Sequence, residues 1–581
     1  MRILGVYYGH NSTAVLLENG VVKDCISEER FTGKKNQTGI PKQSIKYILK
    51  KNKLKPSDIN KIAIPVKTSA PIYASEDTKR DFFISVLNAF FYYVPFVKST
   101  YGFVSFYNPS LRWLGETLYK LFAQTIGSYT ANKERTNIAN FVKVPIDKIE
   151  AFDHHTSHAY AAYYASPYNK EKSLVITLDA EGDGICASVN VFNKDYYERL
   201  TSILASNSPG LMYAGVTKHL CMKVGEHEYK VMGLAPYAKE HEIKKFYPRV
   251  QNLFLVSGLN FRSAFDMRQI GRFLKEEMSD VRFDILSGVF QKILEDTITD
   301  WVASIVETTG IQTVCFAGGV FMNVKLNQKI TEIAGVKKVF FLPSCGDESS
   351  PIGACYQAFE PKSKIQPINS IYWGMEFSEK EIASFIKSKK LDKKYKISHH
   401  RNIEEKIAQL LFKGEIVGRL SGRMEWGARA LGNRSILANP VHQDVVVKIN
   451  EQIKDRDFWM PFTPSILEER IDDYIVNPKH IAAPYMIMTF NTTDLGKREL
   501  KAAMHPYDFT IRPQVVIKSW NPKYHKIISN FQRLTGVGGV LNTSFNLHGL
   551  PVVSGPKEAL YAFENSGLQY LCLENFLISK V

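Results

Sequence analysis

Two β-hairpins of similar design are predicted far apart in the sequence. In the first, apolar segments at 14–18 and 21–27 flank Asn19–Gly20, a dipeptide typical of a two-residue hairpin because both turn positions need positive φ. The second runs from LVITLD (174–179) through the turn AEGDG into ICASVNVF. This repetition predicts a duplicated α/β half-domain, and it limits the fold more than any other feature of the chain.

Length and composition predict a globular protein of several domains. The chain has 581 residues, of which 45% are hydrophobic and 12% aromatic, and this composition excludes a disordered protein. At roughly 150 residues per domain, the length corresponds to about two to four domains. A peptide or a lone binding module is therefore excluded.

A polar, proline-containing stretch at 360–370, EPKSKIQPINS, is predicted to separate two domains. The apolar periodicity stops there, and a new strand-and-helix pattern starts at Ile371. We expect one domain over residues 1–365 and a smaller α/β domain over 366–581.

The aromatic stretch 70–135 has a helical pattern and is interpreted as an insertion in the first domain. Its most apolar window, 82–97, contains Asn88 and Pro95 and is too short to span a bilayer. We therefore expect a buried or cleft-lining helix and no membrane partner. Aromatic residues such as Phe90 suit either core packing or the lining of a substrate pocket.

The excess of positive charge has several interpretations. With 74 Lys+Arg against 58 Asp+Glu, the net charge of +16 suits nucleic acid, an anionic membrane, phosphorylated substrates or a Lys-rich solvated surface. The seven cysteines are scattered without a Cys-x-x-Cys pair, so neither a disulfide framework nor a zinc knuckle is expected. The first residues have a strand pattern rather than that of a signal peptide, and we expect a reducing, cytoplasmic location.

Two histidines four residues apart indicate a metal site. His154 and His158 lie in DHHTSHAYAAYYAS, a helix-like run that places both imidazoles on one face. His155 with His158 is a competing pair, and satisfied structural histidines are the alternative to metal ligands. Asp179 after LVITL and Asp347 in LPSCGDESSPIGA offer carboxylates, unless each only caps a turn or helix. Imidazole and carboxylate together suit Fe²⁺, Mn²⁺ or Zn²⁺ better than Ca²⁺.

Glycine-rich turns after two buried strands indicate a nucleotide site, because such turns let backbone N–H groups approach a phosphate. Each turn alone is weak evidence, since most glycine-rich turns only reverse the chain. Lys230 in EYKVMGLA is either a phosphate contact or a solvated lysine. The turn residues are Gly182, Asp183 and Gly184 in the second hairpin, and Gly318 and Gly319 in AGGVFMN.

His10 follows a strand and Gly9, where a loop would expose it at the mouth of a cleft. Because an unperturbed histidine has a pKa of about 6.5, His10 is a candidate general base, with a structural role as the alternative. Lys34 and Lys35 in EERFTGKKN are either anion contacts or ordinary loop charges.

Arginines are concentrated in RLSGRMEWGARALGNRS in the C-terminal domain. The planar guanidinium binds phosphate or carboxylate through two hydrogen bonds, so this arginine block (419–435) predicts an oxyanion pocket. The turn LNTSFN, which contains Ser544 and two asparagines, is expected to offer hydroxyl and amide donors to the same anion. The charged candidates are Arg419, Arg423, Arg429 and Arg434 in the block, followed by Lys454, Arg456 and Arg512.

Together these motifs resemble the NodU/CmcH-type O-carbamoyltransferase family over essentially the whole chain. The motifs are GHNSTA, EERFTGKKN, DHHTSHA, EYKVMGLA, AGGVFMN, GRMEWGARALGNRS, PFTPS and LNTSFN. The resemblance implies a duplicated actin/hexokinase-like N-terminal domain, similar to the universal tRNA threonylcarbamoyl transferase, and a YrdC-like α/β C-terminal domain.

The resemblance also implies a reaction. Carbamoyl phosphate would yield carbamate in the YrdC-like pocket, where ATP, accompanied by Mg²⁺, would convert it to carbamoyl-adenylate and pyrophosphate. The carbamoyl group would then pass to a hydroxyl of a sugar-like or secondary-metabolite acceptor in the N-terminal domain, assisted by a metal that is expected to be Fe²⁺. Because carbamoyl-adenylate is labile in water, a closed passage between the sites would avoid hydrolysis.

The family's functional positions match residues of this sequence. His154, His158, Asp179 and Asp347 match the metal ligands, and His10 matches the histidine that activates the acceptor hydroxyl. The matched nucleotide positions are Gly182 to Gly184, Gly318, Gly319 and Asn323, with Lys230 added. The matched carbamoyl-phosphate positions are Lys454, Arg512 and Ser544, with Lys454 also expected to be catalytic; Lys35, Arg423, Arg429 and Arg456 complete the predicted substrate set.

Two positions depart from the family pattern. Asn11 stands where Asp is usual, and Met460 stands before PFTPS where Arg is usual, so the acid/base details and one anion contact differ. The alternative function, a tRNA-modifying or nucleic-acid-binding protein, is disfavoured because the chain has no long Lys/Arg run or interleaved aromatic motif. The acceptor and the oligomeric state stay open, a homodimer included.

Overall fold

The computed structural model describes residues 1–68 and 112–580. The aromatic window 82–97, with Phe90, lies outside the described residues. The last part of the predicted insertion belongs to helix α6 (Arg112–Val142).

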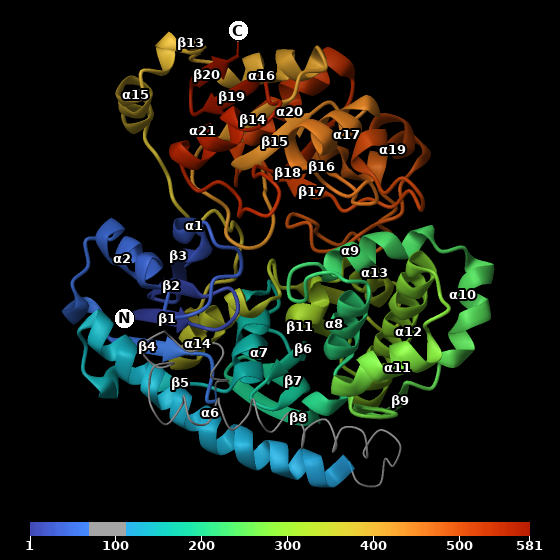
Figure 1. Cartoon of the computed structure of the whole chain (residues 1–581). Helices are drawn as coiled ribbons and strands as arrows, with labels where there is room; N and C mark the ends of the chain where they lie inside the picture. The colour runs from blue at the N-terminus through green and yellow to red at the C-terminus, as the bar shows by residue number, and fades with distance from the viewer. Residues whose placement is uncertain (69–111, 581) are drawn as a thin grey trace. The chain divides into compact units, whose positions relative to one another are not determined.

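The chain forms two compact units (Figure 1). Unit 1 comprises residues 1–28 and 36–368, and unit 2 comprises 29–35 and 369–581. The main division lies close to the predicted one. The sequence analysis did not anticipate that 29–35, which contains helix α1 (Glu29–Thr32), belongs to unit 2.

The first sheet of unit 1 contains the hairpin predicted at the start of the chain. Asn19 and Gly20 both have positive φ, as the two-residue turn requires. The strand order is β3-β2-β1-β4-β5, in which β1 to β3 are antiparallel, while β4 and β5 continue the sheet in parallel. The strands are β1 (Arg2–Tyr7), β2 (Thr13–Glu18), β3 (Val21–Ser27), β4 (Lys61–Ile64) and β5 (Ile149–Ala151).

The second sheet of unit 1 repeats this topology. Its order is β12-β11-β6-β7-β8, again with three antiparallel strands followed by two parallel ones. The predicted duplication of an α/β half-domain is therefore confirmed. The strands are β6 (Ser173–Gly182), β7 (Ile185–Asn193), β8 (Tyr196–Leu204), β11 (Thr313–Ala317) and β12 (Lys338–Phe341).

Helices cover both sheets of unit 1, and a small hairpin of β9 (Phe254–Ser257) and β10 (Asn260–Ser263) lies beside them. None of the helices in the described ranges is both long and apolar enough to cross a membrane. The further helices are α2 (Lys42–Lys51), α7 (His154–Ala165), α8 (Pro209–His219), α9 (Glu228–Leu234), α10 (Glu240–Phe246), α11 (Ile270–Glu277), α12 (Phe283–Thr309), α13 (Val324–Glu332) and α14 (Ser350–Ala358).

Two glycines let α14 pack at backbone distance against α7 and β1. A Cβ on Gly353 of α14 would lie 1.7 Å from the carbonyl oxygen of Ser157 in α7. A Cβ on Gly5 of β1 would lie 2.5 Å from the carbonyl oxygen of Pro351. Helix α7, strand β1 and helix α14 are therefore fixed to one another by close contacts.

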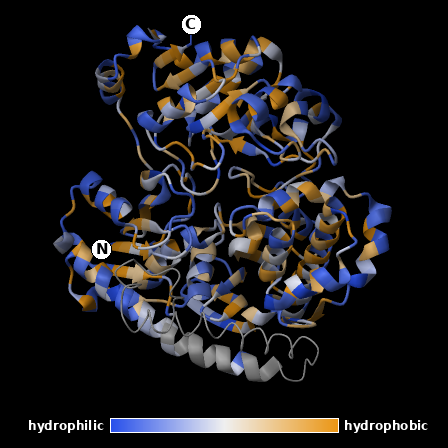
Figure 2. Cartoon of the chain, in the orientation of Figure 1, coloured by the Kyte–Doolittle hydropathy of each residue, from blue (hydrophilic) through white to orange (hydrophobic). Residues whose placement is uncertain are grey.

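Unit 2 is an α/β unit with one mixed sheet in the order β13-β20-β19-β14-β15-β18-β16-β17. The strands are β13 (Lys396–His399), β14 (Val417–Leu420), β15 (Arg434–Ala438), β16 (Thr463–Leu467), β17 (Gln514–Val516), β18 (Gly539–Ser544), β19 (Tyr570–Leu573) and β20 (Phe576–Ser579). Figure 2 shows apolar residues gathered along the strands of both units.

Helices pack against this sheet around a core that includes Leu420, Ile436, Leu541 and Phe563. The helices are α15 (Glu379–Ser388), α16 (Ile403–Phe412), α17 (Asp444–Ile449), α18 (Ile471–Tyr474), α19 (Asp494–Glu499), α20 (Pro522–Thr535) and α21 (Pro556–Glu564).

We predict that Gly353→Ala destabilises unit 1. Its methyl group would overlap the Ser157 carbonyl, and overpacking of this kind costs about 1–3 kcal/mol. Gly271→Ala in α11 is the matched control, because a Cβ there meets no atom within 4 Å. Thermal unfolding should show a lower midpoint for Gly353→Ala alone. Equal midpoints for the two variants would contradict the prediction.

Candidate metal centre and anion pocket

Four side chains from three elements of unit 1 meet in one cluster. His154 and His158 come from the first turns of α7, Asp179 from β6, and Asp347 from the 3-10 turn Asp347–Ser349 before α14. One ligand atom from each of these residues lies within 4.8 Å of every other. The structure thus brings together all four residues that the sequence analysis matched to metal ligands.

Helix α7 starts where it does because of Asp153. The Asp153 side chain accepts a hydrogen bond from the Thr156 N–H at 2.8 Å, and Arg199 holds the same carboxylate in an ion pair. From this cap, residues four apart point the same way along the helix. The Nε2 atoms of His154 and His158 therefore lie only 3.1 Å apart.

The carboxylates face these two nitrogens. Oδ1 of Asp347 lies 3.4 Å from Nε2 of both His154 and His158. Oδ2 of Asp179 lies 3.4 Å from Nε2 of His158 and 3.8 Å from that of His154. Both histidines are buried, and the two aspartates are partly exposed.

The charge balance of the cluster favours a cation. Burial opposes a charge on His154, but Asp347 and Asp179 raise its pKa well above the ordinary value. Burial also opposes ionisation of Asp347, yet the facing histidines hold its pKa well below the ordinary value. Oδ2 of Asp179 is buried and has no hydrogen-bond donor among the described residues. An acceptor left open beside two imidazole nitrogens fits a divalent transition metal.

His155 has a structural role. Its Nδ1 lies 2.7 Å from the Thr177 hydroxyl, and its Nε2 lies 3.1 Å from the Ile185 carbonyl oxygen. Both ring nitrogens are therefore engaged with the hairpin of β6 and β7. The competing pair of His155 with His158 is wrong for this reason.

Glycines bring the chain close to the cluster. A Cβ on Gly182 would lie 2.0 Å from Cδ2 of His154, and a Cβ on Gly319 would lie 3.1 Å from Oδ1 of Asp179. Gly318 has φ of 106°, and its Cβ would meet the Leu178 carbonyl. These glycines therefore let the backbone pack directly against His154 and Asp179.

Other predicted nucleotide residues have contacts within the protein. Asp183 accepts hydrogen bonds from the backbone of Thr68 and His154, both at 2.8 Å. Asn323 caps α13 through the Leu326 N–H at 3.1 Å. Gly184 has positive φ in the hairpin turn, and Lys230 is buried in α9. Asp183 and Asn323 therefore position the backbone around the cluster.

His10 lies in the loop after β1. A Cβ on Gly225 would come within 3.2 Å of its Nε2. Burial raises the pKa of Glu348, the residue after Asp347, and the charge of His10 acts in the opposite direction. His10 is thus near the turn that carries Asp347. Asn11, next in the chain, has positive φ.

Three arginines of the block in unit 2 donate hydrogen bonds to other groups of the protein. Arg434 is fully buried and donates to backbone carbonyls, including those of Met375 at 2.9 Å and Gly422 at 3.2 Å. Arg419 donates to Gly432 and Asn433, and Arg423 donates to the Trp373 carbonyl at 2.7 Å. Arg419 and Arg434 therefore hold the backbone of the block, which corrects their prediction as anion ligands.

Lys454 and Arg512 belong to a cationic cluster within unit 2. Lys454 is 5% exposed and donates to the backbone and hydroxyl of Ser544 and, at 2.5 Å, to Asn546. In the described part of the chain, neither Lys454 nor Arg512 pairs with a carboxylate, and Nε of Arg512 has no hydrogen-bond acceptor. Buried cations without a counter-charge are costly unless an anion binds.

Two arginines and a second lysine complete this cationic cluster, because their charges act on Lys454 and Arg512. Burial lowers the pKa of Lys454 well below its ordinary value, and the charges of Arg456 and Lys35 lower it further. Burial likewise lowers the pKa of Arg512, together with the charges of Arg429 and Arg456. The cationic cluster thus includes Lys35, from the 29–35 segment, together with residues that the sequence analysis placed in the C-terminal domain.

Met460 is buried in this region, and Arg456 lies over the Phe462 ring at 5.2 Å. The guanidinium of Arg456 also donates to the Pro461 carbonyl at 3.3 Å. Arg456 is therefore placed just before PFTPS in space as well as in sequence, where the usual arginine of the family pattern is missing.

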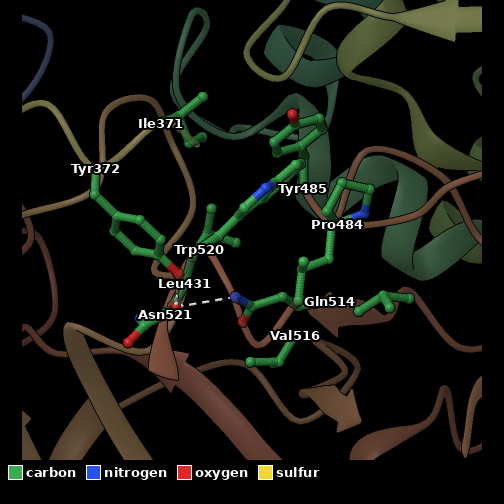
Figure 3. Close-up of a pocket in the computed structure, with 11 residues that line it drawn as sticks. Ile371, Tyr372, Leu431, Pro484, Tyr485, Gln514, Val516, Trp520 and Asn521 are labelled. Carbon is green, nitrogen blue, oxygen red and sulfur yellow. Dashed lines mark hydrogen bonds between the residues drawn. The ribbon is translucent and has the colours of Figure 1, made fainter. Parts of the chain in front are cut away.

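A small aromatic pocket is lined in part by Leu431 of the arginine block (Figure 3). Tyr372, Tyr485 and Trp520 also line it, and its cavity volume of about 10 Å³ holds roughly one water. The Tyr372 hydroxyl and the Gln514 amide both donate to the Leu431 carbonyl, at 2.8 and 2.9 Å. This pocket fixes the loop that follows Arg429 and is too small for a nucleotide.

The sequence analysis missed Tyr7, whose hydroxyl donates to Oδ2 of Asp347. A tyrosine at the end of an apolar strand usually belongs to the core, so its type and position gave no signal. Its contact with Asp347 depends on the packing of β1 against the start of α14, which only the fold reveals.

Comparisons with known proteins identify relatives over the whole chain. A family model described as Carbamoyltransferase N-terminus matches residues 2–356, and one described as Carbamoyltransferase C-terminus matches residues 408–580. The chain is 32% identical to Uncharacterized protein MJ1051 of Methanocaldococcus jannaschii, over 100% of both chains. It is 29% identical to Nodulation protein NolNO of Sinorhizobium fredii, over 98% of this chain and 79% of that protein. Nodulation protein NolO of Bradyrhizobium diazoefficiens is also 29% identical, over 74% of this chain and 79% of that protein. These matches confirm the family resemblance drawn from the motifs.

We predict that Gly182→Ala weakens metal binding by at least about tenfold, because its methyl group would displace the His154 ring. Gly184→Ala is the control: it strains a positive φ in the same turn, but its Cβ meets nothing within 4 Å. Zn²⁺ affinity measured by chelator competition should fall for Gly182→Ala and not for Gly184→Ala. Equal affinities would show that the close approach has no effect on the ligand.

Proposed function

This chain belongs to the carbamoyltransferase family, and we propose that it is an ATP-dependent O-carbamoyltransferase with an activation site in unit 2 and a transfer site in unit 1. The observation that carries the proposal is the cationic cluster around Lys454 and Arg512, neither of which pairs with a carboxylate among the described residues. Carbamoyl phosphate and the ATP phosphates are anions of the kind that such a cluster binds.

In unit 2, one water molecule hydrolyses carbamoyl phosphate to carbamate and phosphate, and carbamate then displaces pyrophosphate from ATP to form carbamoyl-adenylate. The ammonium of Lys454 and the guanidinium of Arg512 bind the donor's phosphate, and Arg429, Arg456 and Lys35 add positive potential. Ser544 and Asn546 orient Lys454 by accepting its hydrogen bonds. Mg²⁺ accompanies ATP in this proposal. The low solvent exposure of Lys454 limits the access of bulk water, which would otherwise hydrolyse carbamoyl-adenylate once it has formed.

In unit 1, the acceptor hydroxyl attacks the carbamoyl carbon, AMP leaves, and His10 takes the hydroxyl proton. A divalent cation such as Fe²⁺, held by His154, His158, Asp179 and Asp347, would supply Lewis-acid polarisation. The net products are the carbamoylated acceptor and AMP.

The acceptor is proposed to be a hydroxylated small molecule, and the reaction is proposed to take place in the cytoplasm. All seven cysteines are unpaired and six are buried, which suits a reducing compartment. A mass-spectrometric screen of hydroxylated metabolites would identify the acceptor by the mass gain of one carbamoyl group in place of hydrogen.

We predict that the protein releases pyrophosphate from ATP when carbamoyl phosphate is present, and that Lys454→Met lowers this rate at least about 100-fold. The variant keeps the length of the side chain but removes the charge that binds the donor. Lys413→Ala, an exposed lysine of the same unit, is the control. Pyrophosphate release should be measured by a coupled assay, together with the melting temperature of each variant. Failure of wild type to release pyrophosphate, with acceptor and metal present, would refute the activation step.

A complementary prediction concerns His158→Ala. This variant should lose carbamoyl transfer by at least about 100-fold but keep pyrophosphate release within about twofold, because the two steps use different units. Exposed His241→Ala should behave as wild type in both assays. Transfer is followed by mass spectrometry of the acceptor. Parallel loss of both activities in a folded His158→Ala protein would argue against separate sites.

A further inference from the structure

Tyr7 is the last residue of β1 and contacts Asp347, one of the four residues of the candidate metal centre. Its hydroxyl donates a hydrogen bond to Oδ2 of Asp347, although the two residues are 340 positions apart in sequence. The Tyr7 side chain is buried, and its ring centroid lies 6.4 Å from that of His154. Tyr7 therefore touches a carboxylate whose other oxygen faces both histidines.

The two oxygens of Asp347 have different partners. Oδ2 accepts the Tyr7 hydrogen bond, while Oδ1 lies 3.4 Å from Nε2 of each histidine. Asp179 has the same arrangement: Oδ1 accepts the Ala180 N–H at 2.6 Å, and Oδ2 faces Nε2 of His158 at 3.4 Å. In each carboxylate, one oxygen is bound to the protein and the other is turned toward the histidines.

Asp347 needs such a hydrogen bond more than Asp179 does. Asp179 lies within strand β6, whereas Asp347 begins a three-residue 3-10 turn that follows Gly346. The Asp347 side chain is also the more exposed of the two, 21% against 14%. A carboxylate on a short turn near solvent can rotate unless a neighbour fixes it, and fixed ligands lose less entropy when a metal binds.

The backbone at Gly9 packs against the hydroxyl group of Tyr7 and restricts the position of this group. A Cβ on Gly9 would lie 2.4 Å from the Tyr7 hydroxyl oxygen, so the chain folds back directly over the phenol. On the other side, Gly5 allows β1 to approach α14 within contact of Pro351. The strand that carries Tyr7 is consequently fixed relative to the turn that carries Asp347, because β1 packs against the start of α14.

We propose that Tyr7 is a positioning residue that holds Asp347 with Oδ1 directed at a bound divalent cation. By donating to Oδ2, the phenol restricts Asp347 to coordination through one oxygen. The inference rests on the metal site of the proposed function, but it does not depend on the donor, the nucleotide or the acceptor.

The test is the metal affinity of the full-length, metal-stripped protein, measured with Zn²⁺ and Mn²⁺ by chelator competition. Tyr7→Phe should weaken binding about 10–100-fold, the range known for residues that orient metal ligands. Tyr8→Phe is the matched control, since it removes a hydroxyl from the adjacent buried tyrosine. It should leave the affinity unchanged within about twofold. The melting temperature of each metal-free variant separates a loss of stability from a loss of binding.

A double-mutant cycle shows whether Tyr7 acts through Asp347. In an Asp347→Ala background, Tyr7→Phe should weaken metal binding no further. Gly9→Ala, which pushes the phenol from outside, should reproduce the loss and covers the case in which Tyr7→Phe does not fold. Wild-type affinity in folded Tyr7→Phe, or an equal loss in the Asp347→Ala background, would overturn the inference. Absence of metal binding in wild type would instead overturn the proposed metal site.

Discussion

The close packing of β1, α7 and α14 determines the geometry of the candidate metal centre. Gly5 and Gly353 bring backbone atoms of these elements into contact, so a shift of one element moves the others. His154 and His158 come from α7, and Asp347 comes from the turn that starts α14. The relative positions of these ligands are therefore set by backbone contacts, and the side chains add only the last adjustment.

Much of the fold, and the grouping of His154, His158, Asp179 and Asp347, was predictable from patterns in the sequence. Asn19–Gly20 and the Glu181–Gly184 turn marked the two hairpins, and the four-residue spacing of His154 and His158 marked one helix face. The choice between His154 and His155 could not be made, since both spacings place histidines on a helix. Only the positions of Thr177 and Ile185, which engage His155, decide it.

The arginine block shows where sequence reasoning reaches its limit. Arg429 and Arg434 are five positions apart in one glycine-rich motif, and both were predicted to bind an anion. Arg434 instead satisfies carbonyl groups of loops that meet inside unit 2, including Met375 and Ser554. Which arginine has carbonyl partners depends on segments far away in the sequence. Lys35 likewise acts on Lys454 of the cationic cluster although the two residues lie far apart in the sequence.

The 29–35 segment gives the chain an unusual path, because it enters unit 2 early, returns to unit 1 at Asn36, and enters unit 2 again at Asn369. Three peptide connections therefore join the units instead of one. During synthesis on the ribosome, α1 emerges long before the sheet to which it belongs. A gene fragment that starts at Asn369 would therefore encode unit 2 without this segment, which contains Lys35 of the cationic cluster.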